Sequence, residues 1–329
     1  MRLIVHICRS ASPLPCLVAA YLMAVAAYPI IRRRNAACIV TVAMACVAIV
    51  ACLFTIPREW VVVRALAALL IIDLIFRLID FARQRWRGDF DVSWKNYCQF
   101  LITFPWLVAV FGQKKRRLRT DQRILADFLR LVLGFAGTAL GVALLLAANK
   151  IAALQSSFVL DHITKLFIFA LTVESISQAL CGAERLMGFD TRPIYDSAVV
   201  SRTPADFWHR ANTRSQAWLY LNVFVPSGGR HALARGVWAT FLASAVLHEI
   251  AFSIAISRIT GYQLMFFLMQ APAVLSSPRL DRLARSWGIW GAALAHAVTV
   301  VWIGATSVFF FDGIDRIFPF FYASHRWQP

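Results

Sequence analysis

Charged residues are scarce in this sequence, and acidic residues are the scarcest. Only 16% of the 329 residues are charged, and Asp and Glu together number 17. A soluble globular chain is typically about one quarter charged, so the composition excludes an ordinary cytosolic domain. A hydrophobic fraction of 60% also excludes disorder, which requires low hydrophobicity. The mean hydropathy of +0.64 therefore indicates a protein whose solvent is largely lipid.

Several catalytic and binding patterns are missing as well. The sequence has no Walker or Rossmann glycine pattern, no Gly-x-Ser-x-Gly elbow and no HExxH zinc signature, which argues against a nucleotide loop, a serine esterase and a metal site. The seven cysteines lie mostly in apolar runs and form no zinc or redox pair, so we assign them no function. Gly134, Gly137 and Gly141 predict close helix packing.

Apolar runs of spanning length recur along the whole chain. A spanning helix needs about 20 apolar residues, and eight segments are candidates: 13–31, 36–56, 61–80, 128–148, 158–180, 233–257, 262–277 and 288–311. A ninth run, 97–111, is short and contains Pro105, so whether it crosses the bilayer stays open. We predict an all-α, polytopic transmembrane helix bundle of about eight to nine spans, forming a single domain over 1–329. The N-terminus resembles a signal peptide without a convincing cleavage site, so we expect a retained first helix.

The basic residues outnumber the acidic ones, 34 to 17, for a net charge of +17. If the N-terminus faces away from the cytoplasm and 97–111 does not cross, 22 basic residues fall in inner loops and 7 in outer segments. This follows the positive-inside rule, so the basic run 114–117 requires no nucleic acid as a partner. The partner expected is the lipid bilayer. The composition favours a bacterial inner membrane over the endoplasmic reticulum and leaves the oligomeric state open.

The longest polar segment, 181–232, combines turn residues with many aromatic side chains. A long loop in a compact protein is usually either functional or disordered. This one is too aromatic for disorder, since it contains Phe207, Trp208, Trp218, Tyr220 and Phe224. We therefore predict a folded cytoplasmic loop that carries short helices and has a function.

Two polar residues, His248 and Glu249, lie inside the apolar run 233–257. Polar groups inside a span are costly and mark function by default. If the helix begins at Leu233, His248 lies about 22 Å along its axis, deep in the hydrocarbon. A neutral imidazole there suits a general base acting on a hydroxyl, or it is simply hydrogen-bonded between helices. Glu249 projects about 100° away around the helix and would neutralise an arginine, orient the histidine through another group, or pair with a polar neighbour.

Other polar residues in the spans leave further alternatives open. His296 is either a second base or a packing residue. Lys165, Glu174 and Gln178 share one span and would form either an ion path or an internal hydrogen-bonded set, which we favour. A transporter that uses Lys165, Glu174 and His248, and a non-catalytic membrane scaffold, are therefore the competing classes.

The segment Asp206–Asn212 is the second informative stretch. Arg210, with Arg214 and Arg230 further on, suits the phosphates of an anionic donor such as acyl-CoA, because guanidinium binds phosphate bidentately. The amide of Asn212 offers both a donor and an acceptor. The alternative is an interfacial amphipathic helix, with Trp at the headgroup level and Arg facing water.

Together the two stretches resemble the membrane-bound O-acyltransferase (MBOAT) family. The Phe-Trp-x-Arg motif of 207–210 leads to Asn212, and a buried His248 follows 36 residues later in an apolar run. The triplet 247–249 looks like the wax synthase-like branch. The stretch 218–229 looks more like the branch that acetylates exported polysaccharides. The motif-bearing region covers about 189–256.

The resemblance implies acyl transfer from acyl-CoA, as a co-substrate, to a hydroxyl of a lipophilic alcohol or small hydroxylated molecule. A saccharide hydroxyl is the alternative acceptor. In this reading His248 is the general base and Asn212 the second catalytic residue. The residues expected to bind substrate are Trp208, Arg210, Trp218 and Glu249. No permanently bound cofactor and no metal are implied.

Overall fold

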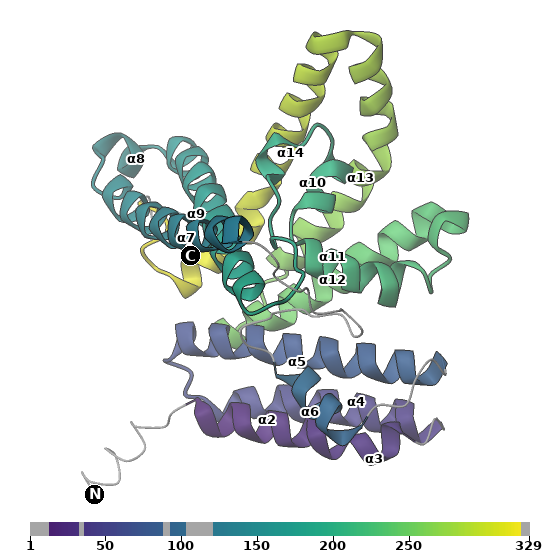
Figure 1. Cartoon of the computed structure of the whole chain (residues 1–329). Helices are drawn as coiled ribbons and strands as arrows, with labels where there is room; N and C mark the ends of the chain where they lie inside the picture. The colour runs from purple at the N-terminus through teal and green to yellow at the C-terminus, as the bar shows by residue number, and fades with distance from the viewer. Residues whose placement is uncertain (1–12, 33–35, 88–92, 103–120, 324–329) are drawn as a thin grey trace, which may run out of the picture. The chain divides into compact units, whose positions relative to one another are not determined.

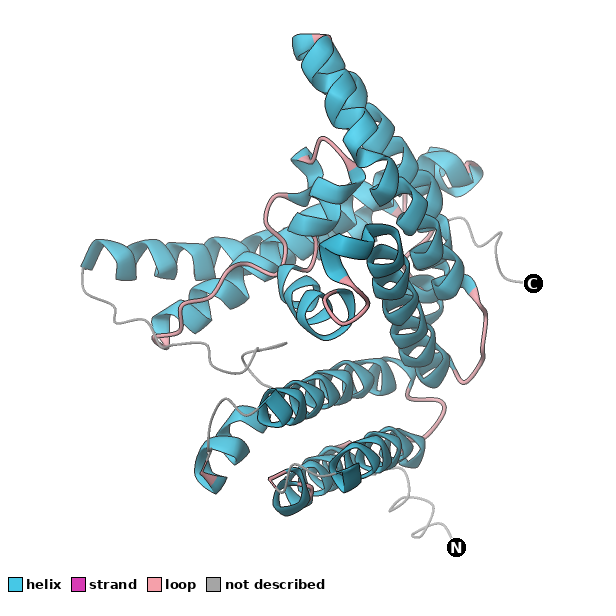
Figure 2. Cartoon of the chain, turned by 90° about the vertical axis from the view of Figure 1, so that its right-hand side faces the viewer, coloured by secondary structure: helices cyan, strands magenta, loops and turns pink. Residues whose placement is uncertain are grey.

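The computed structural model describes residues 13–32, 36–87, 93–102 and 121–323. Every regular element in these ranges is a helix, and they contain no strand (Figure 2). The all-α prediction is thus confirmed for the described part of the chain. The chain divides into two compact units. The first joins Met1–Gly112 to Leu247–Thr260, and the second joins Gln113–Val246 to Gly261–Pro329.

The first unit is built from the N-terminal helices and the end of a later one. It contains α2 (Leu14–Ala26), α3 (Tyr28–Ile31), α4 (Ala36–Ala51), α5 (Val61–Arg87), α6 (Trp94–Leu101) and the last part of α12 (Leu233–Ile256) (Figure 1). Tyr97 is fully buried among them and donates its hydroxyl to the Ala24 carbonyl at 2.6 Å. Its ring packs against those of Tyr28 and Phe81, at centroid distances of 5.0 and 4.6 Å.

Four charged residues of helix α5 are buried together with many of its apolar residues. Arg64, Asp73, Arg77 and Asp80 are all buried, and Arg77 Nε donates to Asp73 Oδ2 at 2.8 Å. Leu66 and its neighbours on the opposite face are exposed. A helix in lipid keeps its charged side chains inside the protein because they are costly in the hydrocarbon, and the four buried charges of α5 follow this arrangement.

The second unit contains the remaining helices. These are α7 (Asp121–Ala148), α8 (Ala152–Ser156), α9 (Phe158–Leu186), α10 (Pro204–Arg210), α11 (Thr213–Leu219), α12 up to Val246, α13 (Tyr262–Ser286) and α14 (Gly288–Ile317). Helices α7 and α9 lie side by side (Figure 1). A Cβ atom at Gly134 would lie 2.5 Å from the Ala179 backbone nitrogen, and one at Gly137 the same distance from Ser175 Oγ. The close helix packing predicted from these glycines is confirmed.

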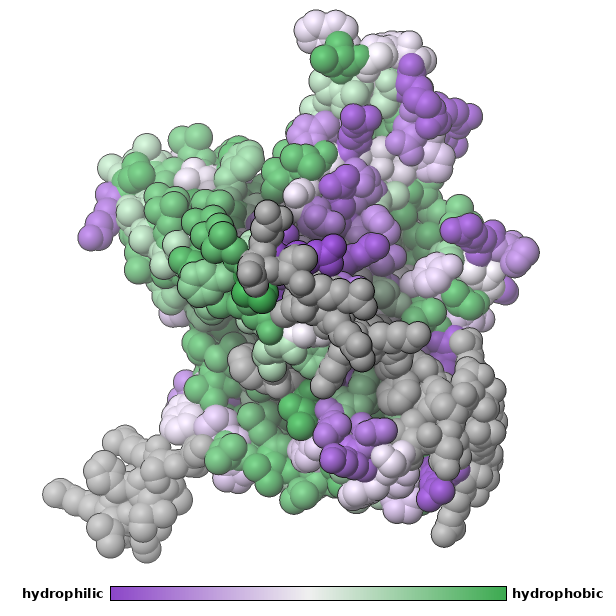
Figure 3. All heavy atoms as spheres, viewed as in Figure 1, coloured by the Kyte–Doolittle hydropathy of each residue, from purple (hydrophilic) through white to green (hydrophobic). Residues whose placement is uncertain are grey.

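Within the described ranges, six helices are long and apolar enough to cross a membrane by length and composition. They are Leu14–Ile31, Cys38–Thr55, Arg123–Ala148, Phe158–Leu186, Gly229–Ile256 and Gly288–Ile317. The two other predicted spans form α5 and α13, which are long enough but more polar. The run 97–111 lies mostly outside the described residues, so the count of eight to nine spans stays a prediction. Apolar side chains cover the outer faces of α7 and α9 (Figure 3), which supports an integral, multi-pass membrane protein.

Candidate functional site

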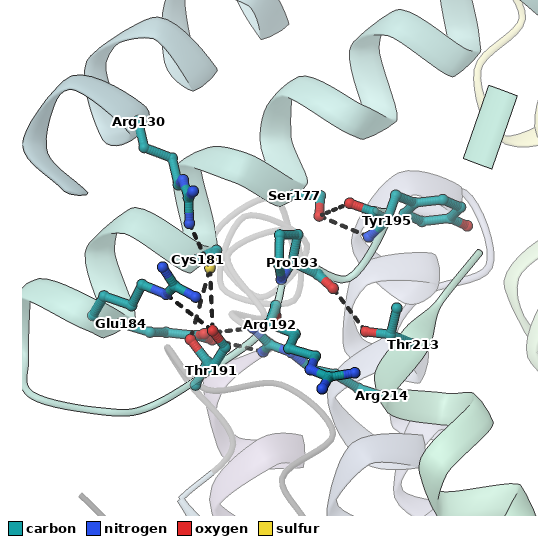
Figure 4. Close-up of polar contacts among 11 residues, drawn as sticks. Arg130, Ser177, Cys181, Glu184, Thr191, Arg192, Pro193, Tyr195, Thr213 and Arg214 are labelled. Atoms are coloured by element: carbon teal, nitrogen blue, oxygen red, sulfur yellow. Dashed lines mark hydrogen bonds and ion pairs between the residues drawn. The ribbon is translucent and has the colours of Figure 1, made fainter. Parts of the chain in front are cut away.

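The polar segment after α9 is bound along that helix and carries the two short helices α10 and α11. Tyr195 N donates to Ser177 Oγ at 2.7 Å (Figure 4). The buried Cys181 thiol lies 3.6 Å from the Thr191 carbonyl. Burial raises the pKa of the Tyr195 phenol to about 12. These contacts fix residues 189–197 and confirm that the segment is folded.

A buried ion pair holds the start of α11 to the end of α9. Arg214 Nη1 donates to Glu184 Oε1 at 2.7 Å, and Arg214 Nη2 bonds the other carboxylate oxygen. Arg214 Nη2 also donates to the Arg192 carbonyl at 3.1 Å. A two-bond Arg–carboxylate contact fixes both position and orientation. Arg214, which the sequence suggests as a phosphate partner, is therefore engaged within the protein.

Helix α10 begins at a well-defined cap. Thr203 Oγ1 accepts a hydrogen bond from Asp206 N at 3.2 Å, and Pro204 occupies the first helical position. Thr at the cap and Pro at the first position are favourable helix-start residues. The backbone N–H of Ala205 donates to Ser277 Oγ of α13 at 2.9 Å. The helix that bears Trp208 and Arg210 is thus placed by its own cap and by a neighbouring helix.

His296, on α14, also helps to hold α10 in place. Its Nδ1 donates to the Ser201 carbonyl at 2.8 Å, and one turn later Thr299 Oγ1 donates to the Arg202 carbonyl at 3.0 Å. Both bonds satisfy backbone oxygens of the segment that enters α10. The geometry favours the packing role for His296 over a second base.

Asn212 lies at the turn between α10 and α11 in a left-handed conformation, with φ 53° and ψ 56°. Asn tolerates this region better than most residues. Its Oδ1 accepts a hydrogen bond from Ser215 N at 3.3 Å, which caps α11. The next backbone N–H, that of Thr213, donates to the Ile194 carbonyl at 2.7 Å. The Nδ2 amino group has no hydrogen-bond partner among the described residues, so the side chain keeps a donor for another group.

Trp208 inserts its indole into an aromatic cluster of the second unit. Its ring centroid lies 5.5 Å from that of Phe241 and 5.7 Å from that of Phe267. The indole Nε1 is buried and has no hydrogen-bond partner within the described residues. A buried tryptophan normally finds an acceptor for this N–H, so Trp208 leaves an unused donor in an apolar surrounding.

Arg210 faces outward from α10. Its Nε donates to Asp206 Oδ1 at 2.9 Å, and about a third of each side chain is exposed. The hydrogen bond and the charge of Asp206 raise the pKa of Arg210. Only Nε is used in this pair, which leaves the terminal nitrogens to contact an anion.

Trp218 is buried near the end of α11, and its carbonyl accepts a bond from Asn222 Nδ2 at 3.1 Å. A short π-helical turn, Tyr220–Phe224, follows. A Cβ at Gly236 would lie 2.7 Å from the Phe224 ring, so α12 begins in close contact with that turn. Trp218 is therefore placed as part of the protein interior.

His248 lies on α12 within the candidate span Gly229–Ile256 and is half-buried. Glu249 is buried, and its Oε1 accepts bonds from Ser253 Oγ at 3.2 Å and from Thr260 N at 3.0 Å. Glu249 thus pairs with polar neighbours, one of the three roles considered from the sequence. His248 and Glu249 belong to the first unit, whereas the residues of α10 and α11 belong to the second.

The three polar residues of α9 do not form one set. Lys165 is fully buried, lies 3.7 Å from Asp161 Oδ1, and donates to the Phe321 carbonyl at 2.7 Å. Glu174 instead accepts a bond from Gln178 Nε2 at 3.0 Å and binds the Ser197 backbone N–H. All three side chains are hydrogen-bonded within the protein, but Lys165 is not joined to the Glu174–Gln178 pair, so they do not form the single set that we favoured.

Sequence reasoning overlooked His162, one turn before Lys165. Its Nε2 donates to the Gly304 carbonyl at 2.9 Å, so Nδ1 accepts from the Tyr322 hydroxyl at 2.6 Å. A histidine inside an apolar run was the signal available. Across the described ranges, no three His, Cys, Asp or Glu side chains gather in a metal-ligand arrangement.

A sequence model of the MBOAT, membrane-bound O-acyltransferase family matches residues 148–310. This is just under half of the chain, and it contains α10, α11 and most of α12–α14. No curated protein matches the chain. The family match supports membership of this protein in the MBOAT family, and that family implies membrane O-acyltransferase activity.

Proposed function

We propose that this protein transfers an acyl group from acyl-CoA to a hydroxyl of a lipophilic alcohol or small hydroxylated molecule, with His248 as the general base. The observation that carries the proposal is the family match over 148–310, which includes both Asn212 and His248. Within the matched range, His248 is half-buried on an apolar helix of spanning length.

The proposed chemistry needs one base and no covalent enzyme intermediate. Neutral His248 takes the proton of the acceptor hydroxyl as its oxygen attacks the thioester carbonyl. The tetrahedral intermediate collapses to the ester, and the coenzyme A thiolate leaves and takes the proton back from the imidazolium. A positioned general base of this kind contributes typically about 10²- to 10⁴-fold to the rate.

Asn212 supports this role through its side-chain amide. Its oxygen is used in capping α11, and its Nδ2 group is left as a donor. A donor of that kind suits the thioester oxygen, on which negative charge develops during attack. The left-handed backbone conformation of Asn212 fixes the direction in which its side chain leaves the main chain.

Arg210 and the tryptophans supply the binding part of the proposal. Arg210 carries a permanent positive charge, and its terminal nitrogens, which the bond from Nε to Asp206 leaves unused, suit a coenzyme A phosphate. Trp208 offers a buried indole N–H amid aromatic rings. Trp218 and Glu249 are both buried, and we assign them to shaping the substrate site. A permanently bound cofactor is not needed for this chemistry.

The acceptor class has a specific alternative. The 247–249 triplet favours the wax synthase-like branch and hence a lipophilic alcohol, in lipid metabolism. The 218–229 stretch favours a saccharide hydroxyl acylated by the same chemistry. The host membrane that we propose is a bacterial inner membrane, where both acceptor classes are accessible.

The test is thioester turnover by the purified protein in nanodiscs. Radiolabelled acetyl-CoA or long-chain acyl-CoA is supplied with either a long-chain alcohol or an oligosaccharide. The variants are His248→Ala and Asn212→Ala, and the exposed His231→Ala is the matched control. Wild type and His231→Ala are expected to form labelled ester at equal rates. The rate for His248→Ala should be lower by about 100-fold or more. Equal ester formation by a monodisperse His248→Ala would remove His248 as the base.

A further inference from the structure

Arg64 in the first turn of α5 is a buried cation without a counterion in the part of the chain that the structure describes. Its side chain is 2% exposed, and its Nη1 donates to Ser257 Oγ at 2.6 Å. Its Nε is buried and makes no hydrogen bond to a described residue. Across the described ranges, no carboxylate oxygen lies within ion-pair distance of this guanidinium. Burying an unpaired charge costs several kcal/mol, so the site lacks a group that would balance it.

The surroundings of Arg64 add positive charge. The exposed Arg58 on the preceding loop acts on Arg64 with a charge of the same sign. Arg258, also exposed, directly follows Ser257. The end of α12 contributes a partial charge of roughly −0.5, which is less than the charge of Arg64 alone. The helix end therefore does not balance the charge of Arg64.

The acidic residues on the same elements do not fill this role. Glu249 on α12 already accepts bonds from Ser253 Oγ and Thr260 N. Glu59, on the loop with Arg58, is exposed to solvent and forms no ion pair with Arg64. Among the described residues, the site thus has positive charge and the unused Arg64 Nε donor but no carboxylate paired with them.

The site lies next to the ends of two candidate spans, and this indicates the depth in the membrane at which a ligand would bind. The candidate span Cys38–Thr55 ends just before Arg58, and the candidate span Gly229–Ile256 ends just before Ser257. Ends of spanning helices lie at the height of lipid headgroups. Ser257 is exposed, and because its oxygen accepts from Arg64, its own hydroxyl proton is left to donate.

We propose that Arg64 and Ser257, flanked by Arg58 and Arg258, form a phosphate-binding site at the end of α12. The ligand is a phosphate group, carried by an anionic phospholipid headgroup or present as a free anion. Arg Nε–H, a serine hydroxyl and two exposed guanidinium groups match the several acceptor oxygens of a phosphate. This site is separate from acyl transfer and does not depend on it.

The experiment titrates the full-length protein in detergent with two probes, short-chain phosphatidylglycerol and inorganic phosphate. Short-chain phosphatidylcholine serves as the zwitterionic lipid control, and intrinsic tryptophan fluorescence reports binding. The variants are Arg64→Gln and Arg64→Lys, and Arg279→Gln is the control at an exposed arginine of the other unit. We expect Arg64→Gln to bind at least about tenfold more weakly than wild type, as expected for loss of a charge-assisted hydrogen bond. Arg279→Gln should bind like wild type.

The two probes distinguish a phospholipid headgroup from a free anion as the source of the phosphate group. Binding of both probes that depends on Arg64 assigns the site to phosphate itself, and binding of phosphatidylglycerol alone assigns it to a lipid. Equal binding by wild type and Arg64→Gln, or no binding of either probe by wild type, overturns the proposal. If Arg64→Gln is not monodisperse, Ser257→Gly decides, because glycine tolerates the φ of 58° at this position. It should bind about fivefold more weakly, and unchanged binding by Ser257→Gly would likewise overturn the proposal.

Discussion

Arg214 at the start of α11 and Glu184 near the end of α9 form a buried ion pair joined by two hydrogen bonds (Figure 4). Arg214 is two residues after Asn212, so the ion pair fixes the turn that carries the Asn212 side chain. A guanidinium held on two oxygens cannot rotate without breaking a bond. The position of Asn212 therefore depends on a contact between residues 30 positions apart in the chain.

Replacing Glu184 by Gln should be strongly destabilising. The change leaves Arg214 buried without a counter-charge, which costs about 3–5 kcal/mol. The measurement is the thermal unfolding midpoint in detergent. Asp206→Asn is the control, because its pair with Arg210 is partly exposed and such pairs contribute about 0–1 kcal/mol. A Glu184→Gln midpoint no lower than that of Asp206→Asn would contradict this account.

Asn212→Gly should separate capping from catalysis. Glycine accepts the left-handed backbone and substitutes for a cap residue at a cost of a few tenths of a kcal/mol. We expect a nearly unchanged unfolding midpoint but a loss of acyl transfer of about 100-fold, since the donor amide is gone. Asn212→Ala should lose both stability and acyl transfer, because alanine disfavours the left-handed φ and provides no cap. Full activity in Asn212→Gly would show that the side chain acts only as a cap.

His296→Asn should retain acyl transfer, whereas His248→Asn should not. An asparagine amide can donate to the Ser201 carbonyl as His296 Nδ1 does, but it cannot accept a proton as a base. The initial rate of ester formation is the measurement, with size-exclusion profiles as the check on folding. Loss of activity in a well-folded His296→Asn variant would return His296 to the candidate bases.

Gly134→Ala should separate α7 from α9. The added Cβ would lie 2.5 Å from the Ala179 backbone nitrogen and 2.7 Å from the Ser175 carbonyl oxygen. Because backbone must shift, we expect a cost of about 1–3 kcal/mol in the free energy of unfolding. Gly304→Ala is the control, since its Cβ would meet only the flexible end of Leu166 at 3.3 Å. Equal unfolding midpoints for the two variants would disprove the packing argument.

Several features of the fold could be predicted from the sequence because they follow from local chemistry. Apolar runs near 20 residues long predicted helices of spanning length, and six meet that description. The glycines of α7 predicted a close approach, and Asp206–Asn212 predicted a folded segment. Helix α5 was predicted as a span despite its charges, but sequence alone does not show that Arg64, Asp73, Arg77 and Asp80 all turn inward.

The roles of individual polar side chains depended on distant partners. Arg214 and Arg210 are equally plausible phosphate partners in the sequence, yet one is buried against Glu184 and the other faces outward. His162 was overlooked because its partners, Gly304 and Tyr322, are more than 140 positions away. A hydrogen bond between helices leaves no local pattern in the chain.

By itself the sequence determined that the protein is a helical membrane protein and which residues are candidates for acyl-transfer chemistry, because hydropathy and side-chain type are properties of single residues and short runs. Only the tertiary structure decided which polar groups are already satisfied and which keep an unused donor. Asn212 caps a helix with its Oδ1 atom and leaves its Nδ2 group for another partner, and the buried Arg64 Nε has no hydrogen-bond partner among the described residues. Burial and pairing are set by segments that meet in space, so they are fixed only when the chain has folded.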